Sequence, residues 1–177
     1  SEANDWRNAE PEADRSFATG HLLHTIAIVL HQDADLFNLA IRHYEAAAAL
    51  RPEAPWIARN LGLAYAGLGR WDRALEAYGK ALELTPEDPT LLTDVGLAWQ
   101  RTGRRERAAE YYRAAIRMNP RFWQAHNDLG ALLLEIGRSD DAIHEFRLAL
   151  DSEPTSAIAA YNLGLALEAK GLRQEAV

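Results

Sequence analysis

The sequence has 177 residues, of which 48% are hydrophobic and 25% charged, which is typical of a globular protein or an array of small folding units. It contains no cysteine, which excludes disulfide bonds and cysteine-based chemistry and leaves the cellular compartment open. The net charge of −7, from 19 basic and 26 acidic side chains, opposes binding to nucleic acid, so we expect no nucleic-acid partner. Apolar runs such as residues 26–30 fall far short of the roughly 20 residues of a membrane-spanning helix.

The N-terminal part of the chain predicts a lead-in followed by an irregular pair of helices. Residues 1–15 are polar, contain Pro11 and clustered acidic side chains, and predict a flexible segment. Residues 21–31 are apolar on more than one face, which predicts a helix of atypical pattern. The next helix has a regular pattern and ends before Pro52. We interpret this pair as a terminal cap, the alternative being a surface that packs on an upstream domain.

The following segment predicts two helices joined by a tight turn. Apolar side chains recur at helical spacing over residues 56–68, and Gly69 supplies the left-handed conformation that ends a helix. A second apolar stripe runs over residues 71–84 and stops at Pro86, because proline cannot donate the next backbone hydrogen bond. The segment therefore forms one helix–turn–helix unit.

The sequence repeats this unit with a period of 34 residues. The aligned columns are Gly62, Gly96, Gly130 and Gly164; Gly69, Gly103, Gly137 and Gly171; Ala40, Ala74, Ala108, Ala142 and Ala176; and Pro52, Pro86, Pro120 and Pro154. Glycine occupies only 11 of 177 positions, so two columns filled by glycine are far beyond chance. We expect Gly62 to lie where the paired helices approach most closely, and Tyr78 to fill the gap between them.

These columns match the pattern of the tetratricopeptide repeat, and the sequence resembles that family over about nine-tenths of its length. The resemblance implies an all-α fold in which about five helix–turn–helix repeats form a right-handed superhelix, or solenoid, over residues 16–177. The repeats run over 21–54, 55–88, 89–122, 123–156 and 157–177, the first atypical and the last truncated. The truncation is expected to leave Leu163 and Leu167 uncovered, so that this end of the chain is prone to self-association.

In proteins that this sequence resembles, the first helices of successive repeats line a concave groove that binds extended peptides. The position before each Leu-Gly or Val-Gly pair lies on that face, and here it holds Asn60, Asp94, Asp128 and Asn162. Asparagines at this position hold the peptide main chain in the repeat region of O-linked N-acetylglucosamine transferases, and the similarity implies the same use here. Further groove residues implied by their repeat positions are Arg59, Asn127, Tyr161 and Trp56, with Ile158 on the same face.

The two aspartates alter the chemistry expected of this groove. A carboxylate accepts hydrogen bonds but cannot donate one, so Asp94 and Asp128 favour basic or donor-rich partners. They would also repel the C-terminal carboxylate that co-chaperones of this family bind with a basic clamp, which disfavours that mode of binding. The alternative is that the polar residues form only a solvated face.

Histidines on the first helix are the candidate metal ligands. His21 and His24 lie one turn apart, whereas His31 is about 10 Å further along the helix axis. At most two ligands converge, fewer than a zinc site needs, so we expect a polar stripe and predict no metal and no cofactor. The sequence contains no nucleophile-elbow, phosphate-loop or zinc-protease motif, so we expect no enzymatic activity.

The sequence therefore predicts a protein-interaction module that binds a protein or peptide along a concave groove. One alternative is the substrate-recruiting arm of a larger enzyme, such as a glycosyltransferase, because the chain opens without methionine and stops inside a predicted helix. Another alternative is a scaffold that binds copies of itself.

Overall fold

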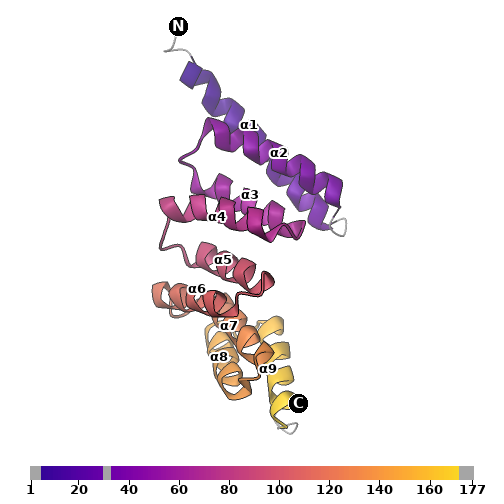
Figure 1. Cartoon of the computed structure of the whole chain (residues 1–177), viewed down its shortest axis with the longest axis vertical. Coiled ribbons are helices and arrows are strands. Elements are labelled where there is room, and N and C mark those ends of the chain that lie inside the picture. Colours follow the sequence, from indigo (N-terminus) through magenta and orange to yellow (C-terminus); the bar gives the residue numbers. More distant parts are fainter. Residues whose placement is uncertain (1–4, 30–32, 172–177) are drawn as a thin grey trace. The chain divides into compact units, whose positions relative to one another are not determined.

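The computed structural model describes residues 5–29 and 33–171, and every regular element in these ranges is an α-helix (Figure 1). The helices are α1 (Asp5–Val29), α2 (Ala34–Leu50), α3 (Pro55–Gly67), α4 (Trp71–Leu84), α5 (Pro89–Arg101), α6 (Arg105–Met118), α7 (Trp123–Glu135), α8 (Ser139–Ser152) and α9 (Ala157–Lys170). The chain divides into two compact units, unit 1 (Ser1–Pro86) with α1–α4 and unit 2 (Glu87–Val177) with α5–α9. The predicted all-α fold of helix–turn–helix repeats is confirmed.

The turn inside each regular repeat depends on a glycine in the left-handed region. Between α3 and α4, Gly69 has φ +69°, a conformation that side chains with a Cβ rarely adopt. Its N–H donates to the carbonyl of Ala66, and the N–H of Arg70 donates to the carbonyl of Tyr65, which closes the end of α3. The glycines at the equivalent turns, Gly103, Gly137 and Gly171, have φ values of +79°, +81° and +84°. The predicted role of Gly69 is confirmed.

Proline begins α3 and α5, and side chains cap α5 and α9, whereas α7 has neither a proline at its start nor a side-chain cap. Asp88 caps α5, because its carboxylate accepts hydrogen bonds from the N–H groups of Thr90 and Leu91. Ser156 caps α9 through the N–H of Ala159. The second helices α4, α6 and α8 follow the turn glycine after one arginine and have no side-chain cap.

A large aromatic ring fills the gap between the two helices of each regular repeat. A Cβ added at Gly62 would lie 2.4 Å from the Tyr78 ring, closer than real Cβ contacts come. Tyr112 lies over Gly96 and Phe146 over Gly130 in the same way. All three rings are buried. The predicted close approach of the helices at Gly62 is therefore confirmed, and the glycine column is explained by the rings that cross it.

The N-terminus differs from the flexible lead-in predicted over residues 1–15. In the structure α1 begins at Asp5, and Pro11 lies within the helix. With 25 residues, α1 is almost twice as long as α3, α5 or α7, which have 13 each. Residues 1–4 lie outside the described ranges. The polar composition and the proline suggested a flexible linker. In the structure the segment is instead part of α1, which packs against α2.

Apolar and ionic contacts join α1 to α2. Ala13 is buried, and the Phe17 ring packs on Tyr44 with 5.7 Å between ring centroids. Asp14 accepts two hydrogen bonds from the guanidinium of Arg51 at the end of α2, at 2.8 and 3.1 Å. Tyr44 lies at the centre of the unit 1 core, together with Phe37, Ala40, Ile41, Leu61, Ala64 and Ala77.

The inner face of α9 is covered, which corrects the prediction that Leu163 and Leu167 lack a partner. Leu167 is 2% exposed, and Leu163 packs partly buried against the unit 2 core of α6, α7 and α8. The helices α7 and α8 both contact α9, and together they cover the apolar face that carries Leu163 and Leu167. The exposed apolar side chains of α9 are instead Ile158, Tyr161 and Leu165.

Candidate functional site

A hollow of about 490 Å³ lies among α5, α6, α7 and α9 and is called the unit 2 hollow here. First helices supply most of its lining, and α6 contributes the hydroxyl end of Tyr112. The polar lining residues are Gln100, Arg101, Asn127, Asp128, Glu135 and Asn162. Three of the predicted groove residues, Asn127, Asp128 and Asn162, therefore come together in one place.

A chain of hydrogen bonds joins these three side chains across two helices. Asn162 Nδ2 on α9 donates to Asn127 Oδ1 on α7 at 2.9 Å. Asn127 Nδ2 then donates to Asp128 Oδ1 at 3.1 Å. Asn127 is only 6% exposed, so its amide is held in one orientation by partners on both sides. The chain presents Asp128 to the hollow as a fixed acceptor.

Burial and a neighbouring charge both act on Asp128. Desolvation raises the pKa of its carboxyl to about 6, and Asp94 on α5 adds to the rise because two like charges oppose ionisation. The hydrogen bond from Asn127 acts in the opposite direction and lowers the pKa. Asp128 is thus ionised at neutral pH and largely protonated near pH 5.

A second hydrogen-bonded chain also lines the hollow. The Tyr112 hydroxyl donates to Gln100 Oε1 at 2.9 Å, and Gln100 Nε2 donates to Glu135 Oε2 at 2.9 Å. Glu135 Oε1 accepts from the Arg105 guanidinium at 2.6 and 2.8 Å. Arg105 and Gln100 hold the pKa of the Glu135 carboxyl below its ordinary value. Glu135 therefore already has a cationic partner, unlike Asp128.

Two predicted groove residues of unit 2 are not part of the hollow's lining, half-buried Asp94 on α5 and Tyr161 on α9. Tyr161 belongs to an exposed apolar surface. Its side chain is 67% exposed, and Ile158 and Leu165 on the same helix are 60% and 39% exposed. Residues spaced by three, four and seven lie on one helix face, so the three form an apolar strip, called the α9 ridge here. Asn162 lies at the edge of this strip, so the α9 ridge adjoins the unit 2 hollow.

The predicted groove residues of unit 1 lie on α3. Trp56 is 50% exposed in the first turn of the helix. Asn60 Nδ2 donates to the backbone carbonyl of Trp56 at 2.7 Å, so one amide hydrogen is used within the helix. Arg59 is half-buried on the same helix.

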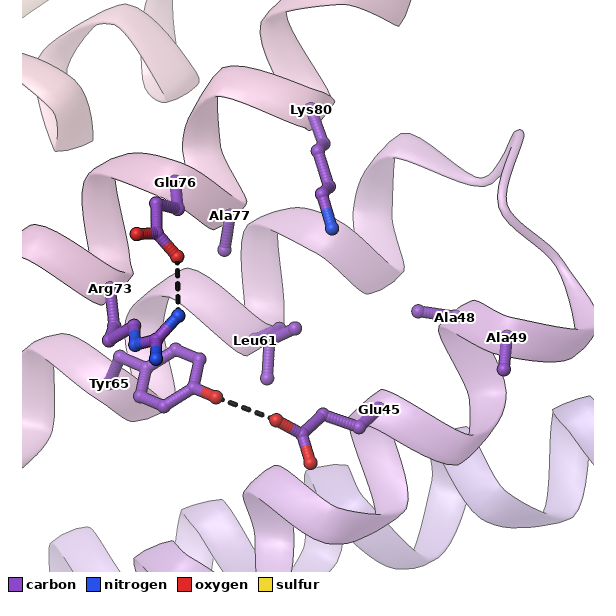
Figure 2. A pocket seen from close by; sticks show the side chains of 9 residues that line it. All are labelled: Glu45, Ala48, Ala49, Leu61, Tyr65, Arg73, Glu76, Ala77 and Lys80. Carbon is purple, nitrogen blue, oxygen red and sulfur yellow. Dashed lines mark hydrogen bonds and ion pairs between the residues drawn. The ribbon is translucent and has the colours of Figure 1, made fainter.

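Unit 1 has a second hollow, of about 360 Å³, between α2 and α4 (Figure 2). Its polar groups mostly bind one another: the Tyr65 hydroxyl donates to Glu45 at 2.7 Å, and Arg73 pairs with Glu76 at 2.8 Å. Burial, with the Glu45 hydrogen bond, raises the pKa of Tyr65 to about 12. Figure 2 shows Lys80 extending from α4 towards this hollow. Because its acids are already partnered, we consider the unit 2 hollow the better candidate site.

The histidines of α1 take packing roles. His24 is buried, its ring packs against Phe37 and Tyr44, and burial lowers its pKa. His21 is exposed and stacks on Phe17. His31 lies outside the described residues. Within the ranges that the structure describes, no three acidic or histidine side chains converge to hold a metal ion.

Sequence reasoning missed Gln100, Tyr112 and Glu135 as parts of the site. Glu135 lies seven residues after Asp128, and Arg101 lies seven after Asp94, so both share the helix face of the predicted position. Extending the pattern by two turns would have found Glu135 and Arg101, whereas Gln100, six residues after Asp94, does not fit this spacing. The Tyr112 hydroxyl had no such signal, because its repeat position reads as core.

Sequence profiles of the tetratricopeptide repeat match residues 55–88, 96–156 and 131–177. No curated protein matches the sequence. The structure resembles the crystal structure of MamA protein, which is 25% identical, with a TM-score of 0.74 over 93% of this chain and 86% of that one. It also resembles YrrB, a TPR protein with an unusual peptide-binding site, at 22% identity and a TM-score of 0.65, covering 92% and 79% of the two chains.

A third similar structure is the first TPR of Spaghetti (RPAP3) bound to the HSP90 peptide SRMEEVD, at 22% identity. Its TM-score is 0.62, and the match covers 66% of this chain and 93% of that one. In the described part of the present chain, no helix has both the length and the apolar character needed to cross a bilayer. The profile matches cover well over half of the sequence, and the helical pairs with their turn glycines agree with them, so the chain belongs to the tetratricopeptide repeat family.

Proposed function

We propose that this chain is a protein-interaction module, without catalytic activity of its own, that holds a peptide or protein on the first helices of its repeats. The unit 2 hollow carries the proposal. It brings three of the predicted groove residues, Asn127, Asp128 and Asn162, into one hydrogen-bonded chain at an open surface. Fixed polar side chains in a concave site give orientation and specificity to a bound ligand.

Two further observations support this use. Trp56 and Tyr161 are exposed at predicted groove positions, and large aromatic side chains are frequent anchors in protein interfaces. The peptide-bound structure of RPAP3 is an example of a similar fold that holds a peptide. Asparagines at the same repeat position hold the peptide main chain in the repeat region of O-linked N-acetylglucosamine transferases. By this similarity, we propose that Asn60 and Asn162 bind the main chain of the peptide.

The test changes the four residues that precede the Leu-Gly or Val-Gly pairs, Asn60, Asp94, Asp128 and Asn162, together to alanine. These residues are called the rungs here, and the variant is called the four-rung variant. Peptides are first selected on the wild-type chain from a random library displayed on phage, and their dissociation constants are measured by fluorescence anisotropy. We expect the variant to bind these peptides about tenfold more weakly or worse, because interface anchors each contribute more than about 1 kcal/mol.

The matched control changes Glu83 and Asp151, which are exposed on the second helices α4 and α8, to alanine. This control should retain wild-type affinity. Circular dichroism should show unchanged helicity in both variants. Equal affinity of the four-rung variant and the wild type would place the binding surface elsewhere.

A further inference from the structure

The unit 2 hollow contains a half-buried carboxylate, that of Asp128, without a cationic partner. Within the described residues, Asp128 forms no ion pair, and its hydrogen bond comes from Asn127. A desolvated carboxylate with one neutral donor is poorly compensated, whereas an incoming cation would give it a charge-assisted hydrogen bond. The group is therefore prepared for a ligand that carries a positive charge.

The groups around Asp128 do not supply that charge. On α5, Asp94 raises the pKa of Asp128, and Arg101 acts on the pKa of Tyr112 and of Glu135. The ring of Tyr112 from α6 directs its hydroxyl to Gln100. On α7 the neighbours are neutral Asn127 and Glu135, which is paired with Arg105, and on α9 the neighbour is neutral Asn162.

An apolar surface lies next to this acidic group. The α9 ridge exposes Ile158, Tyr161 and Leu165, and Asn162 connects the same helix to the hollow through Asn127. Packed helices lie about 8–10 Å apart, and an extended chain advances about 3.3 Å per residue. Two to four residues of an extended peptide therefore span the distance from α7 to the ridge.

Resting on the proposed function, we infer that the partner is an extended segment with a lysine or arginine side chain directed to Asp128. A large apolar side chain, two to four residues away, packs on the α9 ridge. The ammonium or guanidinium group donates to the carboxylate oxygen, and the apolar side chain removes ridge surface from water.

This arrangement links affinity to pH. Binding of a cation requires ionised Asp128, and with a pKa of about 6 roughly one molecule in ten is ionised at pH 5. The affinity of a basic peptide should therefore fall up to about tenfold between pH 7.5 and pH 5. The fall depends on Asp128 and disappears when the carboxyl is replaced by an amide.

The experiment uses the selected peptides and the full chain. The consensus sequence of the selected peptides is determined first. Dissociation constants are then measured at pH 7.5 and pH 5 for the wild type, for Asp128→Asn and for the control Asp151→Asn, which changes an exposed side chain on α8. The amide introduced by Asp128→Asn keeps an oxygen acceptor for Asn127, so we expect this variant to remain folded, which thermal melting checks. Tyr161→Ala changes a 67% exposed side chain and tests the ridge without disturbing the core.

We expect a consensus with a basic residue two to four positions from a large apolar one, a pH effect lost only in Asp128→Asn, and several-fold weaker binding by Tyr161→Ala. Two results would overturn this inference and leave the proposed function standing. In both, the four-rung variant binds the peptides more weakly than the wild type, but the peptides either contain no basic residue or bind equally at both pH values. Peptides that ignore the four-rung variant would overturn both.

Discussion

His126 in unit 2 is a buried side chain whose hydrogen bonds stabilise the fold. It is 4% exposed, and its Nδ1 lies 2.7 Å from Glu145 Oε2 while its Nε2 lies 3.1 Å from the Pro120 carbonyl. Both partners are acceptors, so only the doubly protonated ring satisfies both. The hydrogen bond to Glu145 accordingly raises the pKa of His126, against the opposing effect of burial.

Changing Glu145 to glutamine should lower stability in a pH-dependent way. Because the folded-state pKa of His126 is raised, the pair stabilises the protein fully below pH 6.5 and loses this effect as pH rises through the folded-state pKa. We expect a loss of about 1–2 kcal/mol at pH 5.5 and a smaller one at pH 8.5, measured by urea unfolding. The control His144→Gln, at an exposed position on α8, should show no such difference. An equal loss at both pH values would contradict the assigned protonation.

At the scale of elements, the glycine–aromatic contact sets how closely two helices of a repeat approach. At Gly96 an added Cβ would lie 2.6 Å from the Tyr112 ring, whereas at Gly164 no atom of the described residues lies within 4 Å. The same column of the repeat thus contains one crowded and one open position. Helix propensity alone favours alanine over glycine at both.

Alanine at these two positions should therefore have opposite effects. We expect Gly96→Ala to destabilise the protein by about 1–3 kcal/mol, because the ring must shift within a packed core. Gly164→Ala should be neutral or stabilising by up to about 1 kcal/mol. Thermal melting followed by circular dichroism measures both. If the two variants melted alike, ring crowding would not be the reason for the glycine column.

The helical hairpins could be predicted from the sequence because their turns require glycine, and α4 was predicted at Trp71–Leu84 as observed. The start of α1 could not be predicted. The middle of α1 is held by Asp14 and Phe17, whose partners lie at the end of α2 (Arg51) and on α2 (Tyr44). Burial of Leu167 was missed for a similar reason. The repeat pattern assigned the covering of this residue to the second helix of its own repeat, whereas α7 and α8 of the preceding repeat cover it.

Three residues that line the candidate site, Asn127, Asp128 and Asn162, were predicted, but the hydrogen bonds that connect them were not. Repeat symmetry places Asp128 and Asn162 on equivalent faces, yet the contact that joins them passes through Asn127. Such a link depends on side-chain rotamers between two helices, which a one-dimensional pattern does not contain. Whether these residues contact a partner stays a prediction.

On the scale of the whole chain, stability in repeat proteins is a sum of local and nearest-neighbour interactions. The described helices form two compact units, with separate buried cores around Tyr44 and around Phe146. A defect in one repeat should therefore loosen its own unit first.

Hydrogen exchange can measure this localisation. In Gly96→Ala, we expect amides of α5–α8 to exchange faster than in the wild type, while those of α1 and α2 keep their rates. The reference is Gly164→Ala, in which neither unit should exchange faster than in the wild type. Uniform acceleration across both units would show that the chain opens as one cooperative body.

Tyr112 connects the core of its repeat to the unit 2 hollow. Its ring fills the gap over Gly96, and its hydroxyl reaches Gln100 in the unit 2 hollow, whereas Phe146 fills the next repeat without a hydroxyl. A substitution at Tyr112 therefore changes both the core of its repeat and the lining of the hollow, whereas a substitution at Phe146 changes the core alone.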